Sequence, residues 1–242
     1  MGNFSKSSWA KEAFSNNYLE KADIYVAERW KMFGIVSSIF SYYSKNKKSI
    51  HLLDLGCGDG VLSEVLLKTD NNITATLIDA SQPMLDKAGE RLKGYQNVSF
   101  NKASFNEVLN GNYKLDKYDY CVSSLAIHHL DMAEKENLFK CLYDCLNTDG
   151  HFINLDVVLP PSKELEKVYF SMWSEWMQEM MDKIGITDEN PGDVIKKYKD
   201  PSSMNKPDTL ETQLETLKKT GFIDVDCYYK NNIFTVFGGM KR

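Results

Sequence analysis

The sequence predicts an α/β protein built on a doubly wound, mostly parallel sheet of seven strands that ends in an antiparallel hairpin. Three observations lead to this. Apolar runs alternate with amphipathic segments between residues 50 and 158, a glycine-rich turn joins the first run to the first amphipathic segment, and two β-rich segments close the chain. Alternation of strand and helix is typical of parallel sheets, because each parallel connection needs a crossover.

Residues 1–48 precede this sheet and form an N-terminal helical lid segment in our interpretation. They are rich in aromatic residues, and the apolar spacing from Trp30 to Phe40 fits an amphipathic helix packed on the sheet. The earlier part, which contains Tyr18, Tyr25 and Arg29, has a less regular apolar stripe. We expect that part to close over a ligand.

The regular elements follow in order from Ile50. The apolar runs predict strands, and the segments between them have helical periodicity. The first strand ends at Leu55, and its helix begins at Val61 after the glycine turn. We expect strands at 50–55, 73–78, 98–101, 118–123 and 151–158, and helices at 61–68, 83–92 and 133–146.

Pro160-Pro161 interrupts the alternation and begins an insertion. We predict a helical cap at 160–207, whose helical part runs from about 162 to 199. Its Tyr169, Trp173 and Trp176 are spaced to share one helix face. That face is either the core of the cap, which we favour, or the wall of a pocket for an apolar or cationic substrate.

The rest of the chain returns to the sheet. A helix is expected at 209–220, stopped by Gly221, followed by a hairpin of 222–229 and 233–237. We therefore divide the chain into three parts: the lid (1–48), the sheet domain (49–159 and 208–242) and the cap (160–207).

Composition disfavours several classes of protein. The net charge is −5 and no block of basic residues stands out, so nucleic acid is an unlikely partner. No apolar run approaches the length of a membrane span. The five cysteines, an odd number without a signal peptide, indicate reduced thiols and a cytoplasmic protein. Cys141 and Cys145 lack clustered partners, so we predict no metal site.

The glycine turn predicts a nucleoside-type cofactor. Gly56, Gly58 and Gly60 lie between strand and helix, where residues without Cβ let a ligand approach the backbone. Their spacing departs from the dinucleotide pattern G-x-G-x-x-G. Asp54, two residues earlier, repels a pyrophosphate and favours an ammonium group. The ligand is therefore expected to carry a positive charge here, which disfavours a nicotinamide dehydrogenase.

Asp79 ends the second predicted strand. An acidic residue there accepts hydrogen bonds from ribose hydroxyls. The alternative is an acidic residue that stabilises the start of the following helix. Combined with the glycine turn, the ribose role is preferred.

These stretches resemble the class I S-adenosyl-L-methionine-dependent methyltransferases. The resemblance rests on Asp54–Gly60, on Asp79–Leu85, and on Tyr118–Leu130, which contains His128-His129. The chain is most similar to the small-molecule type with a helical cap. The resemblance implies a Rossmann-like fold and in-line transfer of a methyl group to an O, N, S or C atom, with S-adenosyl-L-homocysteine as the second product.

The resemblance also implies cofactor contacts, residue by residue. The three glycines would pass under the methionine part, Asp54 would orient its amino group, and Asp79 would bind the ribose. Ser104 stands where many members have an aspartate that binds adenine. The full implied set is Asp54, Gly56, Cys57, Gly58, Gly60, Asp79, Ala80, Met84, Ser104, Phe105 and Ser123.

The acceptor site is less defined. In this family a histidine after the fourth strand would face the methyl group, so His128 is the candidate general base or substrate anchor. The alternative is that His128 only packs locally. His129 is the weaker candidate for the same role. For the substrate we name Tyr18, Tyr25 and Arg29 from the lid and Tyr169 and Trp173 from the cap.

Two other functions stay open: methylation of RNA or protein, and binding of S-adenosyl-L-methionine without catalysis. The expected partner is a small-molecule methyl acceptor, and the expected assembly is a monomer or a homodimer.

Overall fold

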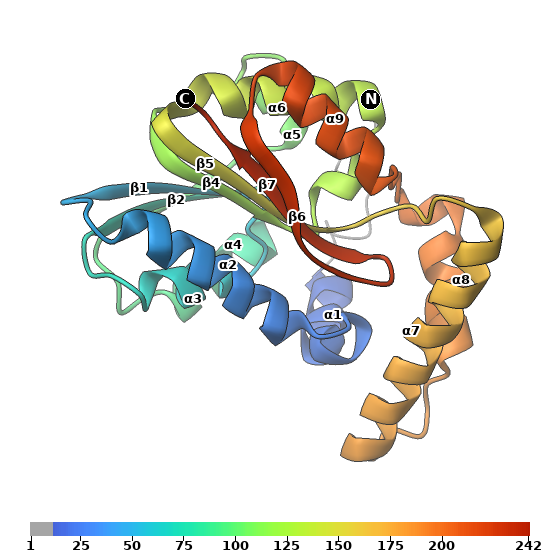
Figure 1. The fold of residues 1–242 in the computed structure, drawn as a ribbon. Helices are drawn as coiled ribbons and strands as arrows, with labels where there is room; N and C mark the ends of the chain where they lie inside the picture. The colour runs from blue at the N-terminus through green and yellow to red at the C-terminus, as the bar shows by residue number, and fades with distance from the viewer. Residues whose placement is uncertain (1–11) are drawn as a thin grey trace.

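The structure is a computed structural model, and it describes residues 12–242. Its centre is one seven-stranded sheet in the order β3-β2-β1-β4-β5-β7-β6 (Figure 1). The strands are β1 (Ile50–Leu55), β2 (Ile73–Asp79), β3 (Val98–Lys102), β4 (Tyr118–Ser124), β5 (Leu146–Val157), β6 (Ile223–Asn231) and β7 (Phe234–Met240).

The direction of the strands confirms the predicted fold class. β1 pairs in parallel with both β2 and β4, and β3 and β5 extend the parallel region on either side. β7 runs antiparallel to β5 and to β6, so the C-terminal hairpin forms one end of the sheet. The carboxyl ends of the parallel strands therefore meet at one edge, where open α/β sheets bind ligands.

Helices cover both faces of this sheet. One face packs α2 (Arg29–Ser44), α3 (Val61–Leu67) and α4 (Gln82–Arg91), and the other packs α5 (Phe105–Leu109), α6 (Met132–Cys145) and α9 (Leu210–Thr220). Alternation along β1 produces the two cores, since Leu52 belongs to the first and Leu53 to the second.

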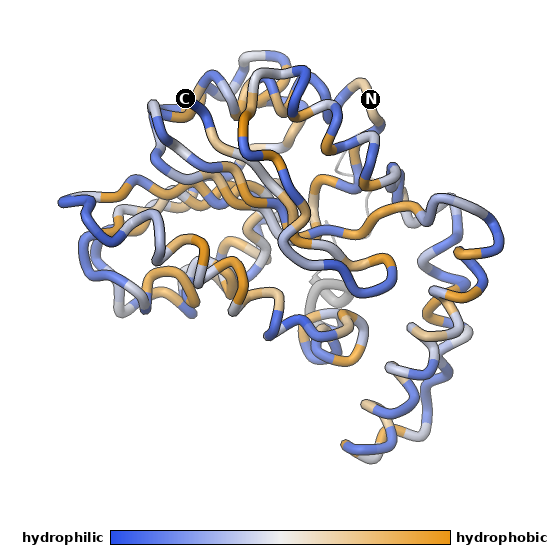
Figure 2. The backbone as a smooth tube through the Cα atoms, in the orientation of Figure 1, coloured by the Kyte–Doolittle hydropathy of each residue, from blue (hydrophilic) through white to orange (hydrophobic). Residues whose placement is uncertain are grey.

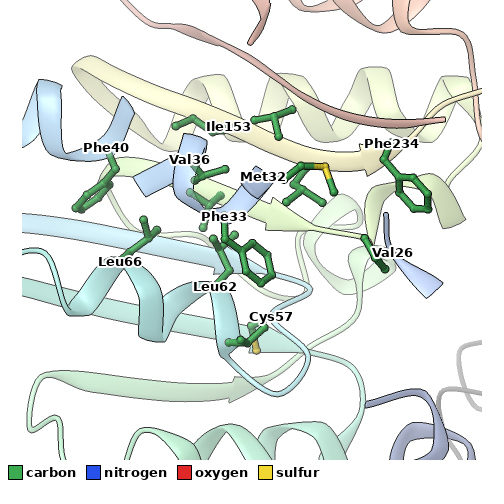
Figure 3. Packing of buried hydrophobic residues seen from close by; sticks show 14 of the residues in the cluster. Val26, Met32, Phe33, Val36, Phe40, Cys57, Leu62, Leu66, Ile153 and Phe234 are labelled. Atoms are coloured by element: carbon green, nitrogen blue, oxygen red, sulfur yellow. The ribbon is translucent and has the colours of Figure 1, made fainter. Parts of the chain in front are cut away.

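Figure 3 shows how α2 packs over the sheet: its Phe33, Val36 and Phe40 lie near Leu62 and Leu66 of α3. Apolar residues follow the strands along most of their length, and hydrophilic residues gather at the turns (Figure 2). No helix between residues 12 and 242 is both long enough and apolar enough to cross a membrane.

The predicted cap contains two helices, α7 (Lys163–Ile184) and α8 (Pro191–Lys199), which extend beside the sheet (Figure 1). Gly185, in the left-handed region with φ 74°, ends α7. Helix α1 (Glu12–Tyr25) is attached to this cap by two indole N–H groups. Trp173 Nε1 donates to the Tyr25 carbonyl at 2.8 Å, and Trp176 Nε1 donates to the Ile24 carbonyl at 3.1 Å. Residues 1–11 of the predicted lid lie outside the described residues.

Two details differ from expectation. β5 begins at Leu146 rather than 151, because Leu146 already pairs with Tyr118 before a register shift in β4. The short helix α5 was not expected; a capping box between Ser104 and Glu107 starts it, although its five residues are too few for a periodic pattern.

Candidate functional site

A cavity of about 190 Å³ lies at the carboxyl ends of β1, β2 and β4. Residues from the glycine turn, the end of β2, the start of α5 and the segment after β4 form most of its wall. Residues of the predicted lid and of the segment that follows α8, at the end of the predicted cap, complete it. Its lining includes Tyr18, Arg29, Gly56, Cys57, Gly58, Asp79, Ala80, Met84, Ser104, Phe105, Ser124, Leu125, His129, Met204 and Lys206.

The glycine turn adopts a backbone that requires glycine. Gly56, Gly58 and Gly60 have φ of 73°, 55° and 74°. A Cβ on Gly56 would lie 2.5 Å from the Ala126 Cβ, so the turn packs against the segment after β4. Apart from its two chain neighbours, no atom in the described part of the chain lies within 4 Å of a Cβ placed on Gly58, and Gly58 lines the cavity. The turn thus leaves room for a ligand against its backbone.

The Asp79 carboxylate is fixed at the cavity wall by two backbone amides. The Gly58 N–H donates to Oδ2 at 2.9 Å, and the Ser81 N–H donates to Oδ1 at 2.8 Å. Burial raises the pKa of Asp79, while these N–H groups favour the charged form. A carboxylate oriented in this way retains lone pairs for hydroxyl donors in the cavity.

Asp54 lies behind the turn rather than in the cavity wall. Its side chain is fully buried, and the Ser63 hydroxyl donates to Oδ2 at 2.7 Å. Oδ1 is buried and has no hydrogen-bond partner among residues 12–242. Burial raises the pKa of Asp54 to about 7. The structure therefore places Asp54 under the start of α3, where it supports the turn.

The predicted adenine-side residues lie together. Ala80, Met84, Ser104 and Phe105 all line the cavity. The Ser104 hydroxyl donates to Glu107 Oε2 at 2.7 Å and accepts from the Glu107 N–H at 3.3 Å, so the capping box already occupies it.

Ser123 is buried below the cavity. Its hydroxyl donates to the Leu55 carbonyl at 2.7 Å and links β4 to β1. The next residue, Ser124, forms the wall instead.

The two histidines occupy different positions. His128 Nδ1 lies 2.5 Å from Asp156 Oδ1, and its backbone N–H donates to Oδ2 of the same carboxylate at 2.9 Å. The nearby imidazole of His128 holds the pKa of buried Asp156 below its usual value, against the effect of burial. His129, not His128, lines the cavity. Burial, and then the neighbouring His128, lower the pKa of His129 to about 3.

Among the predicted acceptor residues, Tyr18 and Arg29 line the cavity. Tyr25 does not, and its hydroxyl donates to both Glu189 carboxylate oxygens at 2.9 Å. Tyr169 accepts a hydrogen bond from Lys230 Nζ at 3.1 Å, outside this cavity. Trp173 is buried in the contact between the cap and the lid.

Sequence analysis missed Met204 and Lys206, which follow α8 within the predicted cap and carry no motif. Tertiary contacts bring them to the cavity. Buried Lys135 donates to the Lys206 carbonyl at 2.6 Å and to Asp208 Oδ2 at 2.5 Å, and the Lys206 N–H donates to the His128 carbonyl at 2.7 Å. No local sequence signal reveals contacts of this range.

Comparison with known proteins agrees with this geometry. Carboxy-S-adenosyl-L-methionine synthase of Nautilia profundicola is 24% identical over 191 residues, which are 78% of this chain and 76% of the relative. Malonyl-[acyl-carrier protein] O-methyltransferase 1 of Ilyobacter polytropus is 32% identical over 105 residues, covering 43% of this chain and 37% of the relative.

Solved structures share the fold. The chain superposes on human N-acetylserotonin methyltransferase in complex with S-adenosylmethionine with a TM-score of 0.61 at 15% identity, covering 96% of this chain and 57% of that one. For an O-methyltransferase family protein from Burkholderia thailandensis the TM-score is 0.63 at 12% identity, and the superposition covers 98% of this chain and 62% of that one. The chain thus spans a little over half the length of these structures.

A family model described as a methyltransferase domain matches residues 46–222, most of the chain. This range contains the glycine turn, Asp79 and the segment after β4. The chain therefore belongs to the methyltransferase-domain family, as a class I S-adenosyl-L-methionine-dependent methyltransferase.

Proposed function

We propose that this protein transfers the methyl group of S-adenosyl-L-methionine to a nucleophilic atom of a small molecule. One observation carries the proposal: the Asp79 carboxylate, oriented by the Gly58 N–H, shares a cavity with the open side of the glycine turn. A ribose bound to that carboxylate would lie beside the turn, with adenine towards Ser104 and Phe105 and the amino-acid part towards Gly56 and Cys57.

Little side-chain chemistry is required for such a transfer. The bound cofactor supplies an electrophilic methyl group on a sulfonium whose departure leaves a neutral thioether. The protein has to hold donor and acceptor in line and to exclude water. Asp79 and the glycine turn would orient the donor, while the lid, with partly buried Tyr18, would cover the acceptor side.

For the acceptor side we propose a contact with His129 rather than with His128, because His129 is in the cavity wall. With a pKa of about 3, its imidazole stays neutral at physiological pH. It can accept a hydrogen bond from an O–H or N–H of the acceptor, although it is too weak a base to hold the proton. This fits a nucleophile that reacts without prior deprotonation by a strong base.

The cofactor site is tested by Asp79→Asn. We expect S-adenosyl-L-methionine to bind at least about 10-fold more weakly to this variant, because a charged acceptor for the ribose hydroxyls is lost. Isothermal titration calorimetry measures the affinity. Asp86→Asn, at an exposed position on α4, is the matched control and should bind normally. Normal affinity of the Asp79→Asn variant would contradict the proposed site.

A second candidate function follows from the curated relatives. The carboxy-S-adenosyl-L-methionine synthases from Nautilia profundicola and from Nitratiruptor match 78% of this chain. This chain would then modify the cofactor instead of donating its methyl group. Mass spectrometry of the nucleosides after incubation with an acceptor library and with cell metabolites distinguishes the two, because methyl transfer yields S-adenosyl-L-homocysteine and the other reaction yields a carboxylated cofactor.

The same measurement tests the remaining alternatives. Binding without any nucleoside product would indicate a non-catalytic binding protein, and product formed only with RNA or protein would indicate a macromolecular acceptor. We also propose a cytoplasmic location, which the five free cysteines support.

A further inference from the structure

Lys135 is a fully buried cation in the first turn of α6. Its side chain has no exposed surface, and its ammonium group donates to the Lys206 carbonyl at 2.6 Å and to Asp208 Oδ2 at 2.5 Å. Both oxygens belong to one segment, residues 204–208. Burying an ammonium group is costly, and replacing a buried ion pair by apolar residues of similar volume is often neutral or stabilising. Stability alone therefore does not explain Lys135, and its role depends on what that segment does.

Tertiary contacts determine the position of residues 204–208. The segment follows α8 and forms neither helix nor strand. The Lys206 N–H donates to the His128 carbonyl at 2.7 Å, and the Leu159 N–H donates to the Asp208 carbonyl at 2.9 Å. With the buried ammonium group, these contacts hold the segment between α6, the turn after β4 and the residues that follow β5.

The segment reaches His129 through Met204. Met204, in the left-handed region at φ 60°, lines the cavity together with His129. Burial and the neighbouring His128 lower the pKa of His129, and a backbone hydrogen bond to Met204 opposes this shift. A hydrogen bond that favours the protonated ring is one that the ring donates, so its acceptor is the Met204 carbonyl. His129 therefore directs one ring N–H at the backbone of this segment.

That hydrogen bond selects the tautomer of His129. A neutral imidazole has one N–H and one nitrogen with a lone pair, and the partner of the N–H decides which nitrogen is which. We propose that Lys135 is a positioning residue of the acceptor site. By holding residues 204–208 against α6, it keeps the Met204 carbonyl on His129 and fixes the tautomer whose second nitrogen accepts a hydrogen bond from an O–H or N–H of the methyl acceptor. This inference rests on the proposed function, which places His129 beside the acceptor.

The tautomer can be read by nuclear magnetic resonance without any ligand. Full-length wild-type and Lys135→Met proteins, labelled with nitrogen-15 in their histidines, are compared at pH 7. The spectrum of His129→Gln assigns the His129 signals among the four histidines of the chain. We expect a single tautomer in the wild-type protein. In Lys135→Met the ratio of the two tautomers should fall by about 10-fold, which corresponds to one hydrogen bond.

Two further measurements separate positioning from stability. Hydrogen–deuterium exchange at residues 204–208 should rise by about 5-fold or more in Lys135→Met, because the segment loses the hydrogen bonds of the ammonium group. The affinity for S-adenosyl-L-methionine, measured by calorimetry, should change by less than about 2-fold, because Lys135 does not line the cavity.

Lys140→Met is the matched control. Lys140 lies on the same helix, is more than half exposed and pairs with Glu136, so its loss should leave the tautomer and the exchange unchanged. Asp208→Asn removes one charge of the buried pair at nearly constant volume, and it should shift the tautomer ratio in the same direction by a smaller factor. Circular dichroism confirms that each variant is folded; if Lys135→Met does not fold, the comparison rests on Asp208→Asn.

Each contrary outcome overturns a defined statement. A folded Lys135→Met protein that melts at a lower temperature but keeps the wild-type tautomer would make Lys135 a structural residue only. A changed tautomer without faster exchange at 204–208 would mean that Lys135 acts on His129 through its charge and not through the segment. A mixture of tautomers in the wild-type protein would overturn the role of the Met204 carbonyl.

Failure of the proposed function gives a different result. If the wild-type protein does not bind S-adenosyl-L-methionine, the proposed function and the acceptor role of His129 are overturned. The positioning of His129 by Lys135 would still be decided by the tautomer measurement, because that measurement uses the protein without ligand.

Discussion

At the scale of single residues, His151 shows how burial links protonation to stability. Its side chain is 4% exposed, and its ring centre lies 4.0 Å from that of Tyr43 and 5.5 Å from that of Tyr120. Burial, and then the charge of Lys47, lower its pKa to about 4. The ring is therefore neutral in the folded protein at pH 5, while a histidine in the unfolded chain, with a pKa near 6.5, is mostly protonated.

Acid should therefore destabilise the protein through His151. Because the unfolded state binds the proton and the folded state does not, the contribution of this group is complete above pH 6.5. It falls as the pH drops towards 4, by at most about 1.4 kcal/mol per pH unit. Urea unfolding at pH 7 and pH 5 measures the loss. His151→Phe, which keeps a stacked ring without a titratable group, should lose less stability over this interval; an equal loss would show that the pKa of His151 does not differ between the folded and unfolded states.

Residues of the candidate site could be predicted where strand and turn chemistry alone fixes their position. Asp79 ends a strand, and Gly58 lies in the turn beside it, so both reach the cavity. The direction of a side chain within a strand or a short turn depends on tertiary packing. Ser63 keeps Asp54 behind the turn, and Asp156 keeps His128 behind His129. No pattern in the sequence indicates either contact.

At the scale of elements, the attachment of α1 to the cap has a defined chemical basis. The last carbonyls of a helix lack partners within the helix. At the end of α1, two such carbonyls accept hydrogen bonds from Trp173 and Trp176 of α7. Lys21 and Tyr25 of α1 also contact Glu189, which precedes α8. The aromatic face of the cap, for which a substrate role was the alternative, thus holds the lid.

Removing the two indole donors should loosen α1. In a Trp173→Phe, Trp176→Phe double variant we expect amide exchange at the end of α1 to rise by roughly 5-fold or more, because each lost hydrogen bond contributes about 1 kcal/mol. Hydrogen–deuterium exchange read by mass spectrometry measures this. Met172→Ala, at an exposed position of the same helix, should leave the exchange unchanged. Unchanged exchange in the double variant would assign the attachment to the Glu189 contacts alone.

The strands and most helices could be predicted because their periodicity is local. How the lid and the cap pack could not. The contacts that join them pair positions about 150 residues apart, as between Trp173 and Tyr25, and they use side-chain donors on backbone carbonyls. Such a pair leaves no periodic trace in the sequence. The same holds for Lys135, a charged residue with no exposed surface that ties α6 to Lys206, at the end of the predicted cap.

At the scale of the whole molecule, one apolar core connects lid, sheet and cap. Phe33 of α2, Leu52 of β1 and Trp173 of α7 belong to the same buried cluster. A shared cluster makes unfolding of one part expose apolar surface of the others, which favours a single cooperative transition. We infer that the lid and the cap are not independent units in terms of stability.

This continuity predicts a single thermal transition. Tryptophan fluorescence reports on the lid and the cap, because Trp9 and Trp30 belong to the lid and Trp173 and Trp176 to the cap. Circular dichroism reports on the whole chain, and the two melting curves should coincide. S-Adenosyl-L-methionine at about 100 times its Kd should stabilise the folded state by about 2.7 kcal/mol and should shift both curves together. We expect the lid to contact the bound cofactor. Separate fluorescence and dichroism transitions that persist with cofactor present would therefore contradict two statements: that the lid, sheet and cap share a core, and that the lid participates in binding.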